Sequence, residues 1–73
     1  MKKIYKLQDL DCANCAAKME NAIKKIDGVN NASVNFLAQR LVLDAEDDKF
    51  EAALAAAEKA IKKVDSHCCI INK

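Results

Sequence analysis

The sequence predicts an α+β fold in which two amphipathic helices lie on one face of a four-stranded antiparallel sheet. Apolar residues alternate over four short segments and recur every three or four positions over two longer ones. These segments follow one another as strand, helix, strand, strand, helix, strand, and this βαββαβ order is typical of ferredoxin-like sandwiches. The 73 residues are expected to form one domain, residues 1–73, near the lower size limit for a core that folds unaided.

The first part of the chain contains a predicted strand followed by a predicted helix. Residues 3–8 alternate, with Tyr5 and Leu7 on one face, as in a half-buried strand. From about residue 13 to 27 the apolar positions fall three and four apart, with charged residues between them. Gly28 is predicted to end this helix as its C-terminal cap, because glycine adopts the left-handed conformation at no steric cost. The predicted buried positions of the helix are Ala16, Met19, Ala22, Ile23 and Ile26.

The second part contains a predicted hairpin, a second helix and a last strand. The alternating segments 29–36 and 40–44 form the hairpin through the short connection 37–39. Acidic residues at 46–48 suit the positive end of a helix dipole, so the second helix is predicted to begin there. A last short strand is predicted over 67–72. The buried stripe of the second helix is predicted to be Phe50, Leu54, Ala57, Ile61 and Val64.

The topology brings distant cysteines to one end of the fold. Right-handed crossovers place the first and last strands side by side and antiparallel. The end of the first strand, the start of the first helix, the 37–39 connection and the start of the last strand then gather at one pole. Cys12 and Cys15 are therefore expected to lie near His67, Cys68 and Cys69.

The composition argues against several classes of partner. A net charge of +1 gives no electrostatic reason to expect nucleic acid or an anionic membrane surface, and Tyr5, Phe36 and Phe50 are too few for a base-stacking platform. No uncharged stretch approaches the ~20 residues that cross a bilayer, so direct membrane insertion is not expected. The first residues lack the apolar run of a signal peptide, which favours a cytoplasmic location.

The four cysteines point to metal or redox chemistry in a reducing compartment. There, thiols serve more often as metal ligands or redox groups than as disulfides. An extracellular mini-protein with two disulfides is the alternative. It is disfavoured because the periodic segments predict a core that needs no cross-links. The sequence shows no hydrolytic constellation, so no catalytic residue is predicted and the domain is not expected to be an enzyme.

The pair Cys12–Ala13–Asn14–Cys15 is the main candidate site. At a junction between a loop and a helix, two sulfurs three positions apart can converge on one ion. The helix N-terminus favours negative charge and so lowers thiol pKa values. Soft thiolates select Cu(I), Zn(II), Cd(II) or Pb(II) over hard cations. A structural zinc site would need four closed ligands, and a thioredoxin-like redox site fits a different strand order.

The segment that contains Cys12 and Cys15 resembles a known protein family. The segment "LDCANCAAKMENAIKKIDGVNNASVNF", residues 10–36, is similar to the metal loop, first helix and second strand of heavy-metal-associated domains. These domains occur at the N-termini of metal-exporting P-type ATPases and in small metallochaperones. The resemblance covers nearly the whole chain. It implies a cytoplasmic domain tethered to the inner or plasma membrane through a full-length transporter, with the rest of that chain or a cognate transporter as its partner.

The loop before the first cysteine departs from the copper pattern of the family. Copper domains carry Gly-Met-Thr-Cys-x-x-Cys, whereas Asp9, Leu10 and Asp11 stand in the first three places here. Leu10 can fill the buried role of the methionine. Asp11 in place of threonine resembles the zinc, cadmium and lead branch, and so does "AIKKVDS", residues 60–66.

Asp11 is a predicted ligand for a divalent ion. Cu(I) is content with two thiolates, whereas a divalent ion prefers higher coordination and Zn(II) accepts carboxylate oxygen beside sulfur. One Cd(II), Zn(II) or Pb(II) ion is therefore predicted, and Cu(I) is disfavoured. The alternative role for Asp11 is a helix N-cap that accepts a backbone N–H.

The tail "SHCCIINK" offers further candidate ligands. Successive strand residues face opposite ways, and matching Cys68 and Ile70 to the inner face makes Cys68 the better candidate than Cys69. A third thiolate would favour Cd(II) and Pb(II) over Zn(II). The alternative is one sulfur in the core and one idle at the surface. His67 could ligate, although a lone histidine at a strand start is more often solvated.

The leading function is soft-metal binding and transfer by thiolate exchange, as the N-terminal domain of a heavy-metal-exporting P-type ATPase. A free-standing metallochaperone, including one for copper, and a thiol redox or sensor protein acting through Cys12 and Cys15 are the alternatives. Any ATPase activity would belong to a chain to which the domain is attached. A monomer is expected, and cysteines at the surface could also bridge two molecules through metal.

Overall fold

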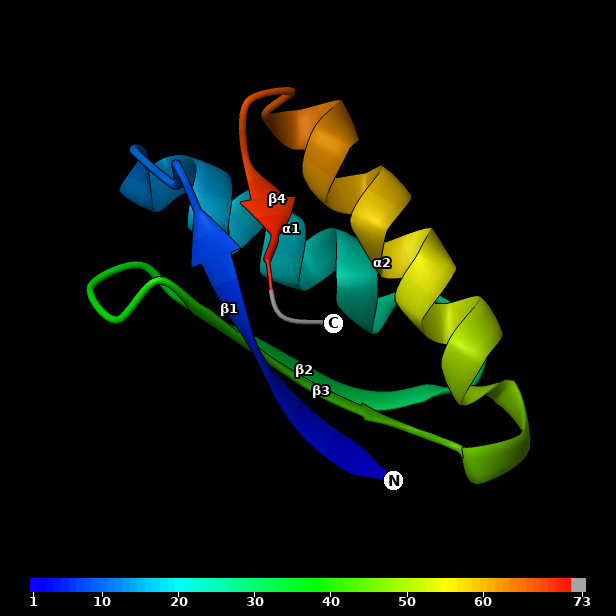
Figure 1. Cartoon of the computed structure of the whole chain (residues 1–73). Helices are drawn as coiled ribbons and strands as arrows, with labels where there is room; N and C mark the ends of the chain where they lie inside the picture. Colours follow the sequence, from blue (N-terminus) through cyan, green and yellow to red (C-terminus); the bar gives the residue numbers. More distant parts are fainter. Residues whose placement is uncertain (72–73) are drawn as a thin grey trace.

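The chain folds into a four-stranded antiparallel sheet with two helices on one of its faces (Figure 1). The structure is a computed structural model and describes residues 1–71. Its elements are β1 (Lys2–Gln8), α1 (Ala13–Lys24), β2 (Val29–Asn35), β3 (Arg40–Ala45), the short 3₁₀ helix η1 (Asp47–Lys49), α2 (Phe50–Val64) and β4 (Cys69–Ile70). The predicted βαββαβ sandwich is confirmed.

The strand order is β2-β3-β1-β4, so the first and last strands are neighbours as predicted. β1 pairs antiparallel with β3, and at its other edge Gln8 lies opposite Cys69 in β4. The last strand is shorter than the predicted range of 67–72, and residue 72 lies outside the described residues. His67 and Cys68 belong instead to a turn in which their backbone N–H groups donate to Asp65. Those donors are therefore not available for strand pairing.

The alternating residues of the strands point into the core as predicted. Tyr5 and Leu7 of β1 and Leu41 and Leu43 of β3 are buried against the helices. The buried helical positions are Ala16, Met19 and Ile23 in α1 and Phe50, Ala53, Ala57 and Ile61 in α2. The other predicted stripe residues are half-buried at the margin of the core: Ala22, Ile26, Leu54 and Val64.

The first helix ends earlier than its apolar pattern predicts, and Gly28 is not its cap. α1 ends at Lys24, and the N–H groups of Lys25 and Ile26 donate to carbonyls three residues back, as in a tightening last turn. Gly28 lies at the entry to β2 with φ +91, and a Cβ there would stand 2.9 Å from the Cβ of Lys49. Glycine is required at this turn for its conformation and for the close approach of Lys49.

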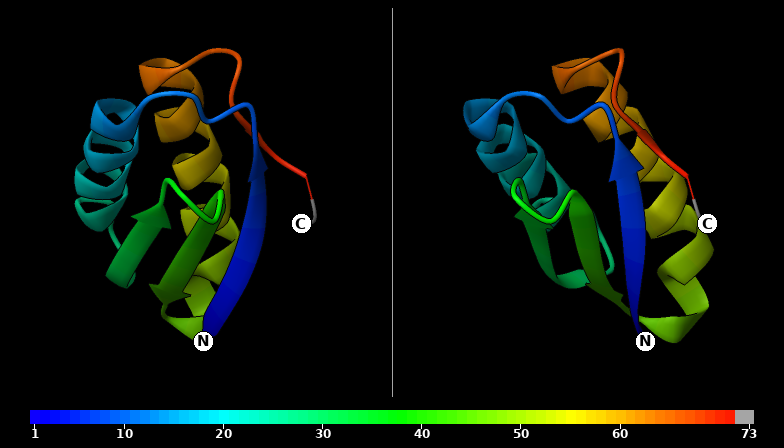
Figure 2. Two further views of the ribbon diagram at one scale, coloured as in Figure 1. Left: turned by 90° about the vertical axis from the view of Figure 1, so that its left-hand side faces the viewer. Right: turned by 60° about the vertical axis from the view of Figure 1, so that its left-hand side comes forward.

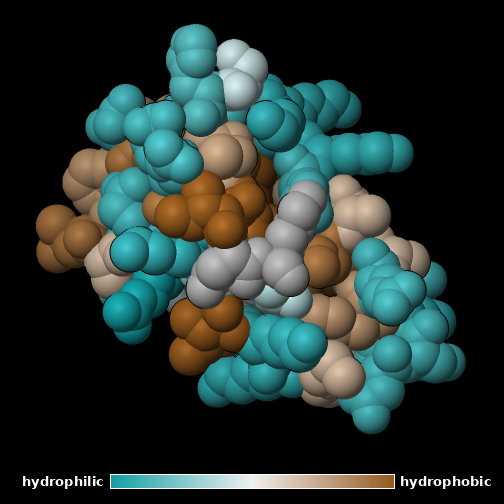
Figure 3. Space-filling model, in the orientation of Figure 1, coloured by the Kyte–Doolittle hydropathy of each residue, from teal (hydrophilic) through white to brown (hydrophobic). Residues whose placement is uncertain are grey.

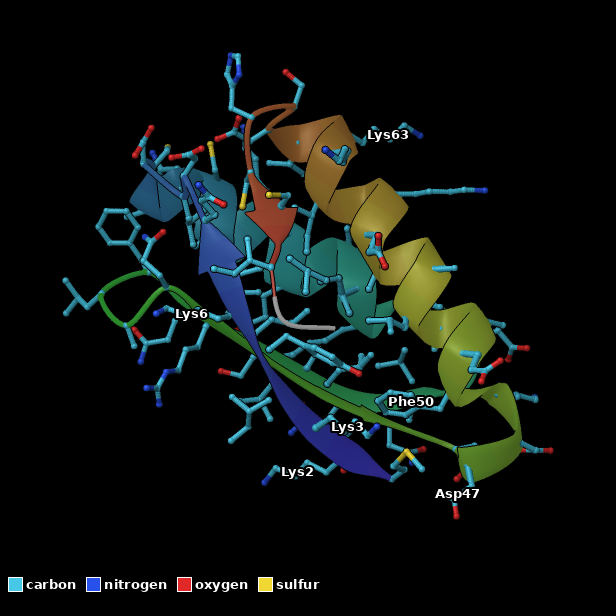
Figure 4. The ribbon with its side chains drawn as sticks, viewed as in Figure 1. Lys2, Lys3, Lys6, Asp47, Phe50 and Lys63 are labelled. Atoms are coloured by element: carbon cyan, nitrogen blue, oxygen red, sulfur yellow. The ribbon has the colours of Figure 1, made fainter. Side chains whose placement is uncertain are left out.

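The start of the chain is tied to the start of α2. The Met1 ammonium donates to the Ala45 carbonyl at 2.8 Å and forms an ion pair with Asp47 at 2.9 Å. The Lys3 ammonium lies 5.9 Å from the centre of the Phe50 ring (Figure 4). These contacts hold together the end of the sandwich where β1 begins, opposite the end at which the cysteine-bearing loops lie.

The surface of the described residues combines polar and apolar side chains. Among residues 1–71, neither helix combines the length and the apolar character that crossing a bilayer demands. The face in Figure 3 is mostly hydrophilic, with hydrophobic side chains in separate areas. The exposed large apolar residues of this part of the chain are Met1, Ile4, Leu37 and Ile71.

Candidate metal centre

Three connecting segments meet where β1 ends, as the sequence predicted. The loop before α1 and the turn after α2 lie at the same end of the molecule in both views of Figure 2. The connection between β2 and β3 joins them, because the Leu7 N–H donates to the Gln39 carbonyl at 2.7 Å. Sulfur atoms lie between the start of α1 and β4 in Figure 4. This end of the sandwich is the candidate metal centre.

Cys12 and Cys15 lie at the start of α1. Cys12 is the N-cap residue, with extended φ and ψ values of −129° and 121°. Its Sγ accepts the backbone N–H of Cys15 at 3.3 Å, and its carbonyl accepts the N–H of Ala16 at 3.1 Å. Both cysteines are free thiols and are half-buried. The cap therefore places one sulfur just before the helix and the other in its first turn, and both are accessible.

The two thiols have opposite pKa shifts. The pKa of Cys12 is lowered, chiefly because the Cys15 thiol donates a hydrogen bond to its sulfur and also because backbone N–H groups of Cys15 and Asn14 point at it. The pKa of Cys15 is raised, chiefly because its proton is held by Cys12. The backbone N–H groups at the helix N-terminus help to lower the pKa of Cys12, as predicted, whereas the contact with Cys12 gives Cys15 a raised pKa instead. Of the two thiols, Cys12 is therefore the one that more readily forms the thiolate.

Asp11 does not cap the helix. Its side chain is exposed, and Cys12 occupies the N-cap position. The alternative role that the sequence left open is therefore wrong, because the Cys12 sulfur already accepts the N–H that a cap would take. Within residues 1–71, no three or more Cys, His, Asp or Glu side chains are clustered closely enough to hold an ion. A ligand role for Asp11 stays a prediction that requires its loop to turn toward the sulfurs.

Cys68 and Cys69 face different environments, as strand alternation predicts. Cys68 is 0% exposed, and its pKa is raised to about 11, mainly by burial and then by the charge of Asp65. Cys69 is half-buried, and His67 is exposed. A cavity of about 180 Å³ beside Cys69 is lined by Glu58, Ile61, Lys62, Cys69 and Ile70. Cys68 is thus the inward thiol, and its role as a ligand, like that of Cys69 or His67, stays a prediction.

Asp65 is a member of this region that the sequence analysis did not single out. It is half-buried at the end of α2, and its Oδ1 accepts the His67 N–H at 3.0 Å. Its carbonyl accepts the Cys68 N–H at 3.2 Å. Its negative charge raises the pKa values of both Cys15 and Cys68. Its position in the sequence could have identified it, because an acidic residue at the C-terminus of a helix interacts unfavourably with the helix dipole and is unexpected there.

Asp65→Asn is expected to make Cys15 more reactive. Removing the negative charge lowers the pKa of Cys15, so its thiolate forms at lower pH and alkylation at neutral pH becomes faster. Alkylation of the individual cysteines, followed by mass spectrometry across a pH series, measures the change. Asp11→Asn removes the same charge from the exposed loop and serves as the control. Equal pH profiles for Cys15 in the two variants would contradict the role of Asp65.

Comparison with known proteins identifies the family. The family model described as "Heavy-metal-associated domain" matches residues 4–67. Over 73 residues the chain is 38% identical to the cadmium, zinc and cobalt-transporting ATPase of Bacillus subtilis (strain 168), and the match covers 100% of this chain and 10% of that protein. The chain therefore spans only about a tenth of the length of this relative.

Two solved structures share the fold. The N-terminal domain of ZntA in its Zn(II) form has a TM-score of 0.72 and 34% sequence identity, and the match covers 96% of this chain and 88% of that one. The CopZ metallochaperone has a TM-score of 0.76 and 25% identity, covering 97% of this chain and 100% of that one. Because the family model matches most of the chain and these folds agree with it, the protein belongs to the heavy-metal-associated domain family.

Proposed function

We propose that this domain binds one soft divalent ion, Zn(II), Cd(II) or Pb(II), between the sulfurs of Cys12 and Cys15. The observation that supports this most directly is the arrangement at the start of α1. The Cys12 sulfur lies 3.3 Å from the backbone N of Cys15, and its lowered pKa favours the thiolate form that binds a soft ion. The relative from Bacillus subtilis is named as a transporter of cadmium, zinc and cobalt, which favours a divalent ion.

Transfer would proceed by exchange of one thiolate for another. An ion first binds the Cys12 thiolate, and the Cys15 thiol then loses its proton to water as its own metal–sulfur bond forms. Both sulfurs are half-buried, so an acceptor thiolate can reach the ion. It forms one new metal–sulfur bond as one bond to Cys12 or Cys15 breaks, and the free ion is never released. The acceptor would be the rest of a heavy-metal-exporting P-type ATPase, of which this chain would be the cytoplasmic N-terminal domain.

Asp11 is proposed to set the preference for a divalent ion. Asp11→Ala is expected to weaken Zn(II) binding by at least tenfold, about the smallest loss seen when a partner of a metal site is removed. Cu(I) binding should change little, because two thiolates satisfy that ion. Competition with a chelator of known affinity measures both. Asp48→Ala, which removes an exposed acidic charge in η1, controls for net charge. Equal losses for the two ions would remove Asp11 from the ligand set.

A free-standing metallochaperone is the second candidate, and the likeness to the CopZ metallochaperone over its whole length favours it. The polypeptide that follows Lys73 in the native gene product separates the two. Transmembrane helices and a phosphorylatable aspartate downstream indicate a pump, and a stop after this domain indicates a chaperone. We propose a monomer in either case. Metal-dependent dimerisation in analytical ultracentrifugation would instead indicate bridging through Cys69.

A thiol redox or sensor protein is the third candidate. The unequal pKa shifts of Cys12 and Cys15 also suit a dithiol in which one sulfur attacks and the other resolves. Anaerobic titration distinguishes this function from metal transfer. A redox protein should cycle a Cys12–Cys15 disulfide while it binds metal weakly, whereas a metal-transfer domain should bind one ion tightly in its reduced form.

A further inference from the structure

Gln39 connects the loop before α1, residues 9–12, to the β2–β3 connection through hydrogen bonds. Its side-chain Oε1 accepts the N–H of Leu10 at 3.0 Å, and its Nε2 donates to the Leu10 carbonyl at 2.5 Å. The same Nε2 donates to the Phe36 carbonyl at 2.9 Å, and the Gln39 carbonyl accepts the N–H of Leu7 at 2.7 Å. The side-chain amide thus pairs with the backbone of Leu10 as a peptide group in a neighbouring strand would.

The backbone is in the left-handed region on both sides of this contact, at Gln39 and at Asp9. Gln39 has φ +55, and Asp9, directly before Leu10, has φ +62. Residues other than glycine adopt the left-handed region rarely and keep it where neighbouring contacts enforce it. The side chain of Leu10 is only 2% exposed, so its backbone polar groups lie where hydrogen-bond partners are needed. Gln39 supplies a partner for both groups.

We infer that Gln39 is a positioning residue of the metal centre. Leu10 stands two residues before Cys12, and Gln39 fixes its backbone to the β2–β3 connection. This contact sets the direction in which Asp11 and Cys12 enter α1, and it confines movement of the loop to the residues after Leu10. The inference rests on the proposed function, because it assigns to Gln39 the task of arranging those ligands in advance. Without the contact the same sulfurs remain, but the loop must be ordered when metal binds.

Gln39→Gly is the most informative substitution. Glycine adopts φ +55 at no cost, so the variant removes the amide without adding backbone strain. Cd(II) affinity is expected to fall about tenfold, as when an outer partner of a metal ligand is lost. The N–H of Leu10 should also exchange with solvent faster in the metal-free protein. Gln39→Glu is the second variant, because its carboxylate keeps the acceptor for Leu10 but faces two carbonyls. It should show the same changes.

Asn35→Ala is the matched control. Asn35 is the last residue of β2, directly before the same connection. Its Oδ1 accepts the N–H of Ala38 at 3.0 Å, a hydrogen bond within the connection that does not involve Leu10. The Asn35→Ala substitution should destabilise the connection. It should leave the Cd(II) affinity and the rate at which the Leu10 N–H exchanges with solvent as they are in the parent. All proteins are compared at a temperature at which their amide spectra show them folded. Equal affinities and equal Leu10 exchange in the Gln39 variants and the control would overturn the inference.

The result also separates this inference from the proposed function. A parent chain that binds no Cd(II) contradicts the proposed function and, with it, the task assigned to Gln39. A parent chain that binds Cd(II) tightly while both Gln39 variants bind it equally well contradicts the inference alone.

Discussion

Cys12→Ser and Cys15→Ser are each expected to abolish tight Cd(II) binding while the domain stays folded. Each substitution removes one of two proposed thiolate ligands, so the loss should exceed the ~100-fold seen when only an outer partner is removed. The fold should persist because serine is a favoured N-cap and its oxygen can accept the N–H that the Cys12 sulfur now accepts. Cys15 is only half-buried, so a serine hydroxyl there remains close to water.

Titration with Cd(II) under anaerobic conditions, followed through the thiolate-to-cadmium absorption band, measures this loss. Thermal unfolding followed by circular dichroism reports whether each variant is folded. Cys69→Ser is the matched control, because it removes a half-buried thiol of the same region that has no place in the leading ligand set. Native Cd(II) affinity in either Cys12→Ser or Cys15→Ser would show that the ion is held elsewhere.

Cys68→Ala is expected to weaken Cd(II) and Pb(II) binding more than Zn(II) binding. A third thiolate benefits the larger and softer ions most, whereas Zn(II) can replace sulfur by oxygen at smaller loss. The three-sulfur absorption band of the Cd(II) form should decrease with it. Recruiting Cys68 has a cost, because the thiol is 0% exposed and burial raises its pKa to about 11. It must lose a proton and its segment must shift before it can bind.

The comparison needs a control for stability as well as for thiol content. Removing the buried sulfur of Cys68 is expected to lower the free energy of unfolding by about 1 kcal/mol, the transfer free energy of one small buried group plus part of the cavity. Affinities are therefore measured well below the melting temperature, and Cys69→Ala removes the neighbouring thiol for comparison. Should both variants bind Cd(II) and Pb(II) like the parent, the ligand set reduces to Asp11, Cys12 and Cys15.

The architecture could be predicted from the sequence because periodicity reports directly on burial. Alternation at Tyr5 and Leu7 and at Leu41 and Leu43 identified the inner face of the sheet, and all four side chains are buried. The same rule placed Cys68 inward of Cys69. The order of the elements determines which loops share one end of the sandwich, and the sequence alone therefore predicts the end at which Cys12 and Cys15 lie.

The structure differs from the sequence-based predictions where two neighbouring groups could make the same hydrogen bond. Cys12 rather than Asp11 caps α1, and the turn after Asp65 uses N–H groups that would otherwise extend β4. Gln39 contacts Leu10 from a backbone in the left-handed region. Such contacts depend on local backbone dihedral angles and on residues far apart in the chain. Neither produces a periodic pattern of apolar residues that could be recognised in the sequence.

The central claim is that Cys12 and Cys15 together hold one soft divalent ion. NMR of the reduced protein loaded with an NMR-active cadmium isotope tests it directly, because scalar couplings between the metal and cysteine β-protons identify the sulfurs bound to it. The account predicts couplings to the β-protons of both Cys12 and Cys15 in a complex of one ion per chain. Couplings that lead only to Cys68 or Cys69, or a cadmium signal with no coupling to Cys12 and Cys15, would contradict it.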